Sequence, residues 1–280
     1  MPVPTVTLNN GVQIPQLGYG VFQIPPDETE KHVSEALEAG YRHIDTAKVY
    51  GNETGVRKAI DSSGIKREEL FVTTKLWNSD QGKSTAVPAF EKSLSKLGLE
   101  QLDLYLIHWP MPAKAEWINT YLALQDGPYA NGQVRALGVS NFSHAHLRKL
   151  LLATDVKPAV NQIELHPRFP QDEARAFHAE HEIVTEAWSP IGQGQGLLED
   201  PVLATIGKAY DKSPAQVVLR WHVQLGNVVI PKSVTPSRIA ENIDVFDFEL
   251  STDDMAQVSG MSPTDGTGRL GPDPDTFEIE

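Results

Sequence analysis

The chain has 280 residues and no cysteine, which excludes disulfides, thiolate nucleophiles and cysteine-ligated metal sites. Its formal net charge of −13 argues against a nucleic-acid partner or an anionic membrane surface, because both bind basic surfaces. The first 20 residues lack a secretory signal pattern, and no apolar run approaches the roughly 20 residues that span a bilayer. We therefore expect a cytoplasmic protein.

The chain opens with two short strand-like runs around Asn10-Gly11, a pair typical of a type I′ hairpin. From there on, β-rich runs alternate with amphipathic segments. The last of the long segments contains Ser213-Pro214, which is typical of a helix start. The predicted strands are 16–20, 42–44, 70–76, 103–108, 134–139, 159–163, 183–187 and 227–230, and the predicted helical segments lie near 28–39, 53–63, 83–98, 114–126, 143–153, 171–181, 201–224 and 236–242.

This alternation predicts an α/β fold with a parallel sheet and helical crossovers. Eight strand–helix units favour a closed (β/α)8 TIM barrel over an open, doubly wound sheet. The opening hairpin is then expected to cap the barrel bottom, and residues 262–280, rich in Pro, Gly and Asp, are expected to form an irregular loop. No composition break marks a second domain, so we expect one domain over residues 1–280.

Four side chains with useful chemistry lie at the ends of predicted strands or shortly after them, on the side of a barrel where active sites lie. They are Asp45, Tyr50, Lys75 and His108. A nearby ammonium favours ionisation of a phenol, a carboxylate keeps a buried lysine charged, and a neutral histidine can orient a carbonyl oxygen. Together these groups could polarise a carbonyl and protonate the alkoxide that forms when a hydride arrives. The hydride has to come from a cofactor.

Three long motifs give the chain a family resemblance. They are GYRHIDTA with YGNE (40–53), LGVSNF (137–142) and IPKS (230–233) with the residues that follow it. Together they resemble the signatures of the aldo-keto reductases over essentially the whole length. QLGYGVFQ, VNQIELHP and ENIDVFDFEL look most like the bacterial 2,5-diketo-D-gluconate reductases. The resemblance implies an NADPH-dependent, monomeric barrel enzyme that reduces small carbonyl compounds, with 2,5-diketo-D-gluconate and other keto sugars among the candidate substrates.

The resemblance also implies residue roles. Tyr50 would be the general acid, Lys75 would lower its pKa, Asp45 would pair with Lys75, and His108 would orient the carbonyl. Phe22, Trp77 and Trp109 would line the substrate pocket. The cofactor would contact Ser140, Asn141, Gln162, Trp188, Ser189, Ile191, Gln193, Lys232, Ser233, Val234, Arg238, Glu241 and Asn242.

Other interpretations remain open from the sequence. Residues 192–196 (GQGQG) are not a dinucleotide fingerprint, because the spacing and the place in the chain are wrong; they form either a lid over the pyrophosphate or a plain connection. Lys48 could attract acidic substrates or be a solvated surface charge. We expect no metal site. The rival functions are an NADP(H)-binding sensor with little turnover, and a barrel isomerase or lyase that uses Lys75 as a Schiff base.

Overall fold

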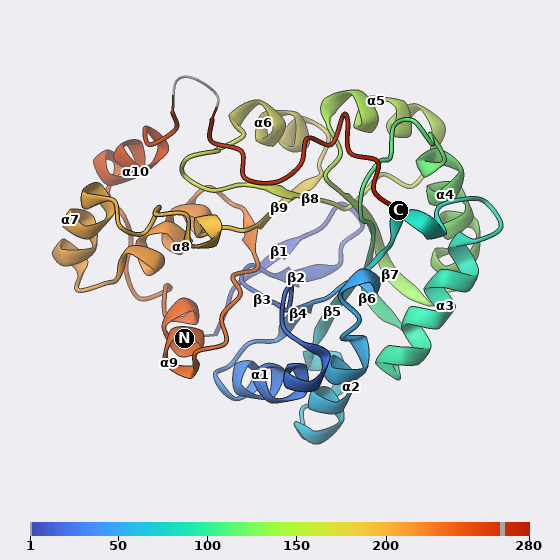
Figure 1. Ribbon diagram of the computed structural model, residues 1–280, viewed down its shortest axis with the longest axis horizontal. Coiled ribbons are helices and arrows are strands. Elements are labelled where there is room, and N and C mark those ends of the chain that lie inside the picture. The colour runs from blue at the N-terminus through green and yellow to red at the C-terminus, as the bar shows by residue number, and fades with distance from the viewer. Residues whose placement is uncertain (1, 264–266) are drawn as a thin grey trace.

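The computed structural model describes residues 2–263 and 267–280. Its main sheet contains eight parallel strands that pair in chain order. A parallel bridge between Leu17 and Val229, with Gly18 N donating to Val229 O over 2.8 Å, closes the ring and confirms the predicted (β/α)8 barrel (Figure 1). The strands are β3 (Tyr19–Gly20), β4 (His43–Asp45), β5 (Phe71–Leu76), β6 (Leu102–Ile107), β7 (Val134–Ser140), β8 (Val160–Glu164), β9 (Val184–Trp188) and β10 (Val228–Val229).

Helices surround this ring and cover its outer face (Figure 1). Their apolar faces point to the core: α8, for example, buries Val217, Val218 and Trp221 at the three- and four-residue spacing of a helix. The α-helices are α1 (Pro26–Glu38), α2 (Glu53–Ser62), α3 (Ala86–Leu97), α4 (Trp117–Leu124), α5 (His144–Ala153), α6 (Asp172–Glu180), α7 (Pro201–Tyr210), α8 (Pro214–Gln224), α9 (Pro236–Ile243) and α10 (Thr252–Ser259).

Three helical predictions need correction. The segment 201–224 is two helices, because Asp211 takes a left-handed conformation (φ 55°) and ends α7, and Ser213 then caps α8. The segment 114–126 is shorter as an α-helix and continues as a π-helix over Gln125–Tyr129. Helix α10 was not predicted at all, although Ser251 caps it in a box with Asp254, a pattern readable in the sequence.

The opening hairpin pairs β1 (Thr5–Thr7) with β2 (Gln13–Pro15) and confirms the predicted cap. Leu8 and Ile14 pack against strand residues in the lower barrel interior. The prediction of a type I′ turn was wrong. Among the residues of this turn only Gly11 has a positive φ (85°), and its N–H donates to Leu8 O. This geometry is that of a type I turn followed by a bulge. A type I′ turn would need a positive φ at both central residues.

The tail after α10 runs from that helix across the barrel toward α4 (Figure 1). It carries no helix or strand in the part that is described, as expected, and residues 264–266 of the predicted loop lie outside the described residues. The backbone N–H groups of Leu270 and Gly271 donate to the Glu164 carboxylate over 2.6 and 2.8 Å. The tail is therefore fixed above the carboxyl ends of the strands. Within residues 2–263 and 267–280, no helix is long and apolar enough to cross a membrane.

Buried histidines make the fold sensitive to acid. His178 lies on α6, where its ring nitrogens contact Asn161 and Thr185 at 2.9 Å each. Burial, with His144 and His181 nearby, lowers the pKa of His178 from 6.5 to about 3. Burial also lowers the pKa values of His43 and His222 to about 3.

The unfolded chain therefore takes up protons below pH 6.5 that the folded chain does not bind until about pH 3. We expect the free energy of unfolding to fall as the pH falls through this window. In His178→Gln, the proton uptake on urea unfolding at pH 5 should drop by about one proton relative to the wild type. An unchanged uptake would contradict the assignment.

Candidate active site

The four predicted catalytic side chains meet at the carboxyl ends of the strands. Asp45 ends β4, Lys75 is the penultimate residue of β5, and His108 directly follows β6. Tyr50 ends a 3-10 helix, Lys48–Tyr50, that follows β4. Parallel strands in a barrel bring their carboxyl ends to one rim, so side chains distant in sequence share one mouth.

Lys75 and Asp45 form a buried ion pair at the base of this mouth. Lys75 Nζ lies 2.6 Å from Asp45 Oδ1 and donates to Thr46 O over 3.0 Å. Burial alone would lower the pKa of Lys75, but the charges of Asp45 and Tyr50 outweigh it, so the pKa is raised. Lys75 therefore remains an ammonium although its side chain is fully buried.

Tyr50 lies beside that ammonium, with Lys75 Nζ 5.4 Å from the centre of its ring. Burial raises the pKa of Tyr50 above its ordinary value of 10.0, and Asp45 acts in the same direction. Lys75 lowers it, as expected from the sequence, but does not outweigh burial. The phenol is therefore protonated across the neutral range, which is the form that a proton donor needs.

His108 is buried, and burial together with Lys75 holds its pKa well below 6.5. The imidazole is therefore neutral at pH 7. Its ring centre lies 5.8 Å from that of Tyr50 and 5.2 Å from that of Trp77, both edge to face. Nδ1 has no hydrogen-bond partner among the described residues. A neutral imidazole beside the phenol can donate a hydrogen bond to a carbonyl oxygen.

Aromatic rings surround these polar groups. Phe22 is 48% exposed and lies 5.1 Å from Tyr50 between ring centres. Trp109 packs on Phe277 of the tail, with ring centres 4.3 Å apart. The structure thus brings the three predicted pocket aromatics, Phe22, Trp77 and Trp109, around the tetrad. Phe277 was missed, although it is an isolated aromatic in a polar tail and could have been suspected of packing.

The residues predicted around the nicotinamide gather at the neighbouring strand ends. Trp188 Nε1 donates to Asn141 Oδ1 over 2.8 Å, and Asn141 Nδ2 donates to His108 O over 2.9 Å. Ser140 Oγ donates to the backbone oxygen of Gln162 over 2.8 Å. These bonds join β7, β8 and β9 to the tetrad, so a ligand beside Trp188 would also lie beside His108.

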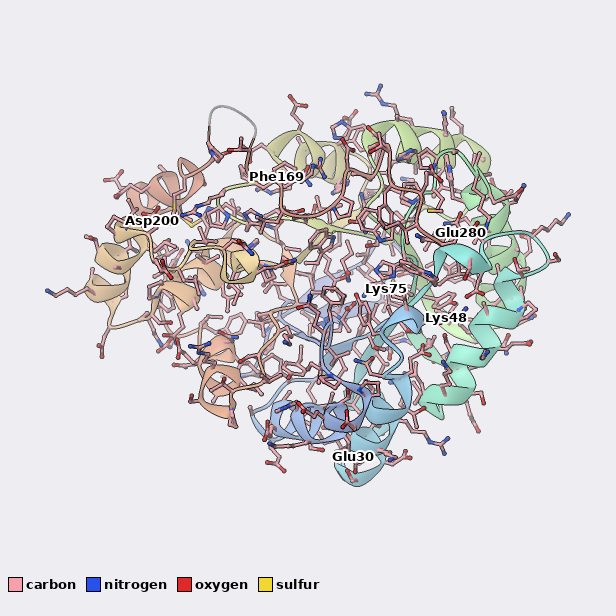
Figure 2. All side chains as sticks on the ribbon, in the orientation of Figure 1. Glu30, Lys48, Lys75, Phe169, Asp200 and Glu280 are labelled. Atoms are coloured by element: carbon pink, nitrogen blue, oxygen red, sulfur yellow. The ribbon has the colours of Figure 1, made fainter. Side chains whose placement is uncertain are left out.

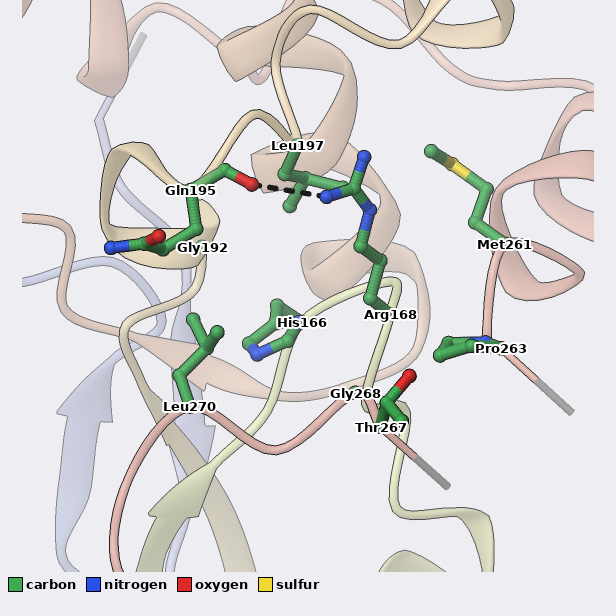
Figure 3. A pocket seen from close by; sticks show the side chains of 10 residues that line it. All are labelled: His166, Arg168, Gly192, Gln195, Leu197, Met261, Pro263, Thr267, Gly268 and Leu270. Atoms are coloured by element: carbon green, nitrogen blue, oxygen red, sulfur yellow. Dashed lines mark hydrogen bonds between the residues drawn. The ribbon is translucent and has the colours of Figure 1, made fainter. Parts of the chain in front are cut away.

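The loop after β9 carries Ser189, Ile191 and Gln193, and Gln193 Nε2 donates to Ser189 Oγ over 2.5 Å. Arg168 fastens the glycine-rich part of this loop, because its guanidinium donates to Gln195 O over 3.0 Å (Figure 3). It also donates to Gly196 O over 3.1 Å. A cavity of about 310 Å³ separates the loop from the tail. Arg168 therefore holds the loop in place, and its role as a lid over the pyrophosphate stays a prediction.

The remaining predicted cofactor residues follow β10 and continue into α9. Lys232 and Arg238 form no ion pair within residues 2–263 and 267–280, and Val234 is 40% exposed. Ser233 O accepts a 2.5 Å hydrogen bond from Tyr19. Two of the predicted cofactor residues already have contacts within the protein. Glu241 accepts a hydrogen bond from Ser213 Oγ, and Asn242 is buried.

Lys48 is neither a free charge at the mouth nor a solvated surface lysine. It pairs with Asp80, and both side chains are only partly exposed. In the view of Figure 2, Lys75 lies nearer the middle of the barrel than Lys48. Because Asp80 neutralises the ammonium, Lys48 offers little attraction to an acidic substrate.

Comparison with known proteins identifies the family. The family model described as "Aldo/keto reductase family" matches residues 15–262. The chain belongs to this family. It is 54% identical over 280 residues to an aldo-keto reductase of Mycolicibacterium smegmatis, covering 99% of this chain and 98% of the relative. It is 50% identical over 272 residues to the glyoxal reductase of Bacillus subtilis, covering 97% and 96%.

Among solved structures, a mutant of Gox0644 in complex with NADPH superimposes with a TM-score of 0.94 at 46% identity, covering 100% of both chains. The family resemblance predicted from the motifs is thereby confirmed. The closer resemblance to 2,5-diketo-D-gluconate reductases stays a prediction.

Proposed function

We propose that this aldo/keto reductase reduces small aldehydes and ketones, with a hydride from NADPH and a proton from Tyr50. The observation that carries the proposal is the convergence of Tyr50, Lys75 and His108 at one rim of the barrel. The directions of their pKa shifts agree with it, because they favour a protonated phenol, an ammonium and a neutral imidazole. The named relatives support a small dicarbonyl substrate, because one of them is a glyoxal reductase. Keto sugars such as 2,5-diketo-D-gluconate are ketones and therefore also fall within this proposal.

The chemistry follows from the charges in the site. The substrate oxygen accepts hydrogen bonds from Tyr50 and His108, which polarise the carbonyl. Bound NADPH supplies the hydride that the side chains lack. Tyr50 gives its proton to the oxygen as negative charge develops there, and the ammonium of Lys75 stabilises the phenolate that is left. Asp45 holds Lys75 in place at 2.6 Å, so the positive charge is present before the substrate binds.

The residues present suit NADPH. Trp188 offers an indole ring beside Asn141, fixed by a 2.8 Å hydrogen bond, where the nicotinamide would lie. Lys232 and Arg238 are cations without an ion pair in the described part of an otherwise acidic protein, and a phosphate monoester needs such donors. The other proposed cofactor contacts are Ser140, Gln162, Ser189, Ile191, Gln193, Ser233, Val234, Glu241 and Asn242.

The test follows NADPH absorbance with purified protein and a panel containing methylglyoxal, 2,5-diketo-gluconate and an aromatic aldehyde, with NADH run in parallel. We expect turnover with at least one carbonyl and a marked loss with NADH. Tight NADPH binding without turnover of any carbonyl would favour the sensor function instead.

Removal of the two cations should change cofactor preference. In Lys232→Ala and Arg238→Ala we expect the KM for NADPH to rise about 10- to 100-fold, because each loses a charge-assisted hydrogen bond to phosphate. The KM for NADH, which lacks that phosphate, should change little. Lys92→Ala, an exposed lysine on α3, is the matched control and should alter neither value. An equal rise of the KM for NADPH and for NADH would contradict the assignment of Lys232 and Arg238 to the phosphate.

The monomeric state, the cytoplasmic location and the single domain over residues 1–280 stay predictions.

A further inference from the structure

A second carboxyl group lies in the barrel interior beside the catalytic ion pair. Glu186 is the middle residue of β9, its side chain is fully buried, and its Cα is in register with that of Gln162 on β8. Neither the proton transfer nor the proposed cofactor contacts use this residue. A buried carboxyl is costly unless neighbours compensate for its burial, so its contacts call for an explanation.

Gln162 connects Glu186 to Asp45. Its Nε2 donates to Asp45 Oδ2 over 2.8 Å and to Glu186 Oε2 over 3.0 Å. An amide nitrogen has two hydrogens, so both are used by these two carboxyl groups. The amide oxygen is then the only polar atom of this side chain left for a further partner. Because an oxygen of each carboxyl group accepts from Nε2, the two groups also fix which way the amide is turned.

The other oxygen of Glu186 is different. Oε1 has no hydrogen-bond partner among the described residues and lies 3.7 Å from His43 Nε2. His43 on β4 is neutral, since burial lowers its pKa to about 3, and its Nε2 lies 3.1 Å from Thr73 Oγ1. The charged groups that face Glu186 are therefore Asp45 on β4 and Lys75 on β5.

One ammonium cannot balance two carboxylates in this interior. Burial, and then the charge of Asp45, raise the pKa of Glu186 from 4.5 to about 8, while Gln162 and Lys75 act in the opposite direction. Glu186 is therefore neutral at pH 7 and ionises on the alkaline side. Its ionisation would place a second negative charge beside Lys75, which offsets the effect of that ammonium on Tyr50 and makes the phenol a weaker acid.

We propose that Glu186 is a positioning residue of the reductase site, which acts on the cofactor through the amide of Gln162 and on Tyr50 through the Asp45–Lys75 pair. The inference rests on the proposed function. Glu186 is not a catalytic residue, because it reaches the reacting atoms only through Gln162, Asp45 and Lys75.

Two variants separate these effects. Glu186→Gln keeps an acceptor for Gln162 but cannot ionise, whereas Glu186→Leu removes the acceptor. Asp103→Asn is the matched control, because Asp103 is a buried carboxyl at the opposite end of the barrel, where it pairs with Arg67 and Arg135. Asp103→Asn should lower the free energy of unfolding but leave NADPH binding and the pH dependence of kcat unchanged.

Three measurements test the proposal. By fluorescence titration, the Kd for NADPH should rise about fivefold in Glu186→Leu, the effect of one lost hydrogen bond, and stay at the wild-type value in Glu186→Gln at pH 6.5. The kcat of the wild type should fall as the pH rises through about 8, and that of Glu186→Gln should not. In the protein without cofactor, the infrared difference between wild type and Glu186→Gln should show a protonated carboxylic acid at pH 6 that disappears by pH 10.

Wild-type binding and pH dependence in Glu186→Leu would overturn the proposal, as would an equal change in Asp103→Asn. If the wild type binds NADPH but reduces no carbonyl, the proposed function fails while the binding and infrared measurements still decide the part played by Glu186. If it does not bind NADPH, the infrared band alone decides, and its absence at pH 6 would overturn the inference.

Discussion

Tyr50→Phe is expected to lower kcat by about 10²- to 10⁴-fold, the usual contribution of a positioned proton donor. The variant removes one oxygen atom and keeps the ring that packs on Phe22 and faces His108. The Kd for NADPH should therefore stay close to the wild-type value. The measurement is steady-state turnover of the best carbonyl of the panel at pH 7, beside a fluorescence titration with NADPH.

Tyr121→Phe is the matched control for that variant. Tyr121 on α4 is fully buried, and its hydroxyl has no hydrogen-bond partner among the described residues, so Tyr121→Phe loses only an unbonded oxygen. It should turn over like the wild type. A loss of less than about tenfold in Tyr50→Phe would show that another group donates the proton, because a tenfold change corresponds to only about 1.4 kcal/mol of barrier.

Breaking the interior ion pair from one side should destabilise the folded state strongly. In Asp45→Asn the ammonium of Lys75 stays buried without a counter-charge, and we expect the free energy of unfolding to fall by about 3–5 kcal/mol. In Lys75→Met the free energy of unfolding should fall by somewhat less than in Asp45→Asn, since Gln162 still donates to Asp45 over 2.8 Å. The double variant should be more stable than Asp45→Asn alone, because no uncompensated charge remains.

The exposed pair Lys157–Glu182 provides the comparison, with a similar N–O distance of 2.8 Å. Its double-mutant cycle, from Lys157→Met and Glu182→Gln, should give a coupling energy below about 1 kcal/mol, as exposed pairs do. Urea unfolding at pH 7 measures both cycles. Coupling of equal size in the two pairs would mean that Lys75 and Asp45 are better solvated than their burial indicates.

The sequence predicted the parts that depend on local pattern. Strand–helix alternation is visible residue by residue, and the barrel rule then places Asp45, Lys75 and His108 at one rim without any knowledge of distances. The failures have physical reasons. Ser213-Pro214 indicated where α8 starts, but the end of α7 depends on Asp211 in a left-handed conformation, which Asp adopts in a minority of cases.

Long-range contacts were beyond prediction from local pattern. The contact of Phe277 with Trp109 joins residues far apart in the chain, and no periodicity marks it. The pairing of Lys48 with Asp80 has the same cause, since nothing in either neighbourhood indicates the other. The net pKa shift of Tyr50 also escaped prediction, because the sequence reveals that an ammonium is near but not that the effect of burial outweighs it.

The tail has a consequence for how the mouth moves. It crosses the rim without a helix or strand of its own in its described part, and its hold on the rim comes from separate points, among them the two N–H groups bound to Glu164 and the ring of Phe277. Lifting it breaks these contacts but no strand pairing, so it costs far less free energy than opening the barrel. Entry to the mouth can thus open by local unfolding while the tetrad beneath keeps its geometry.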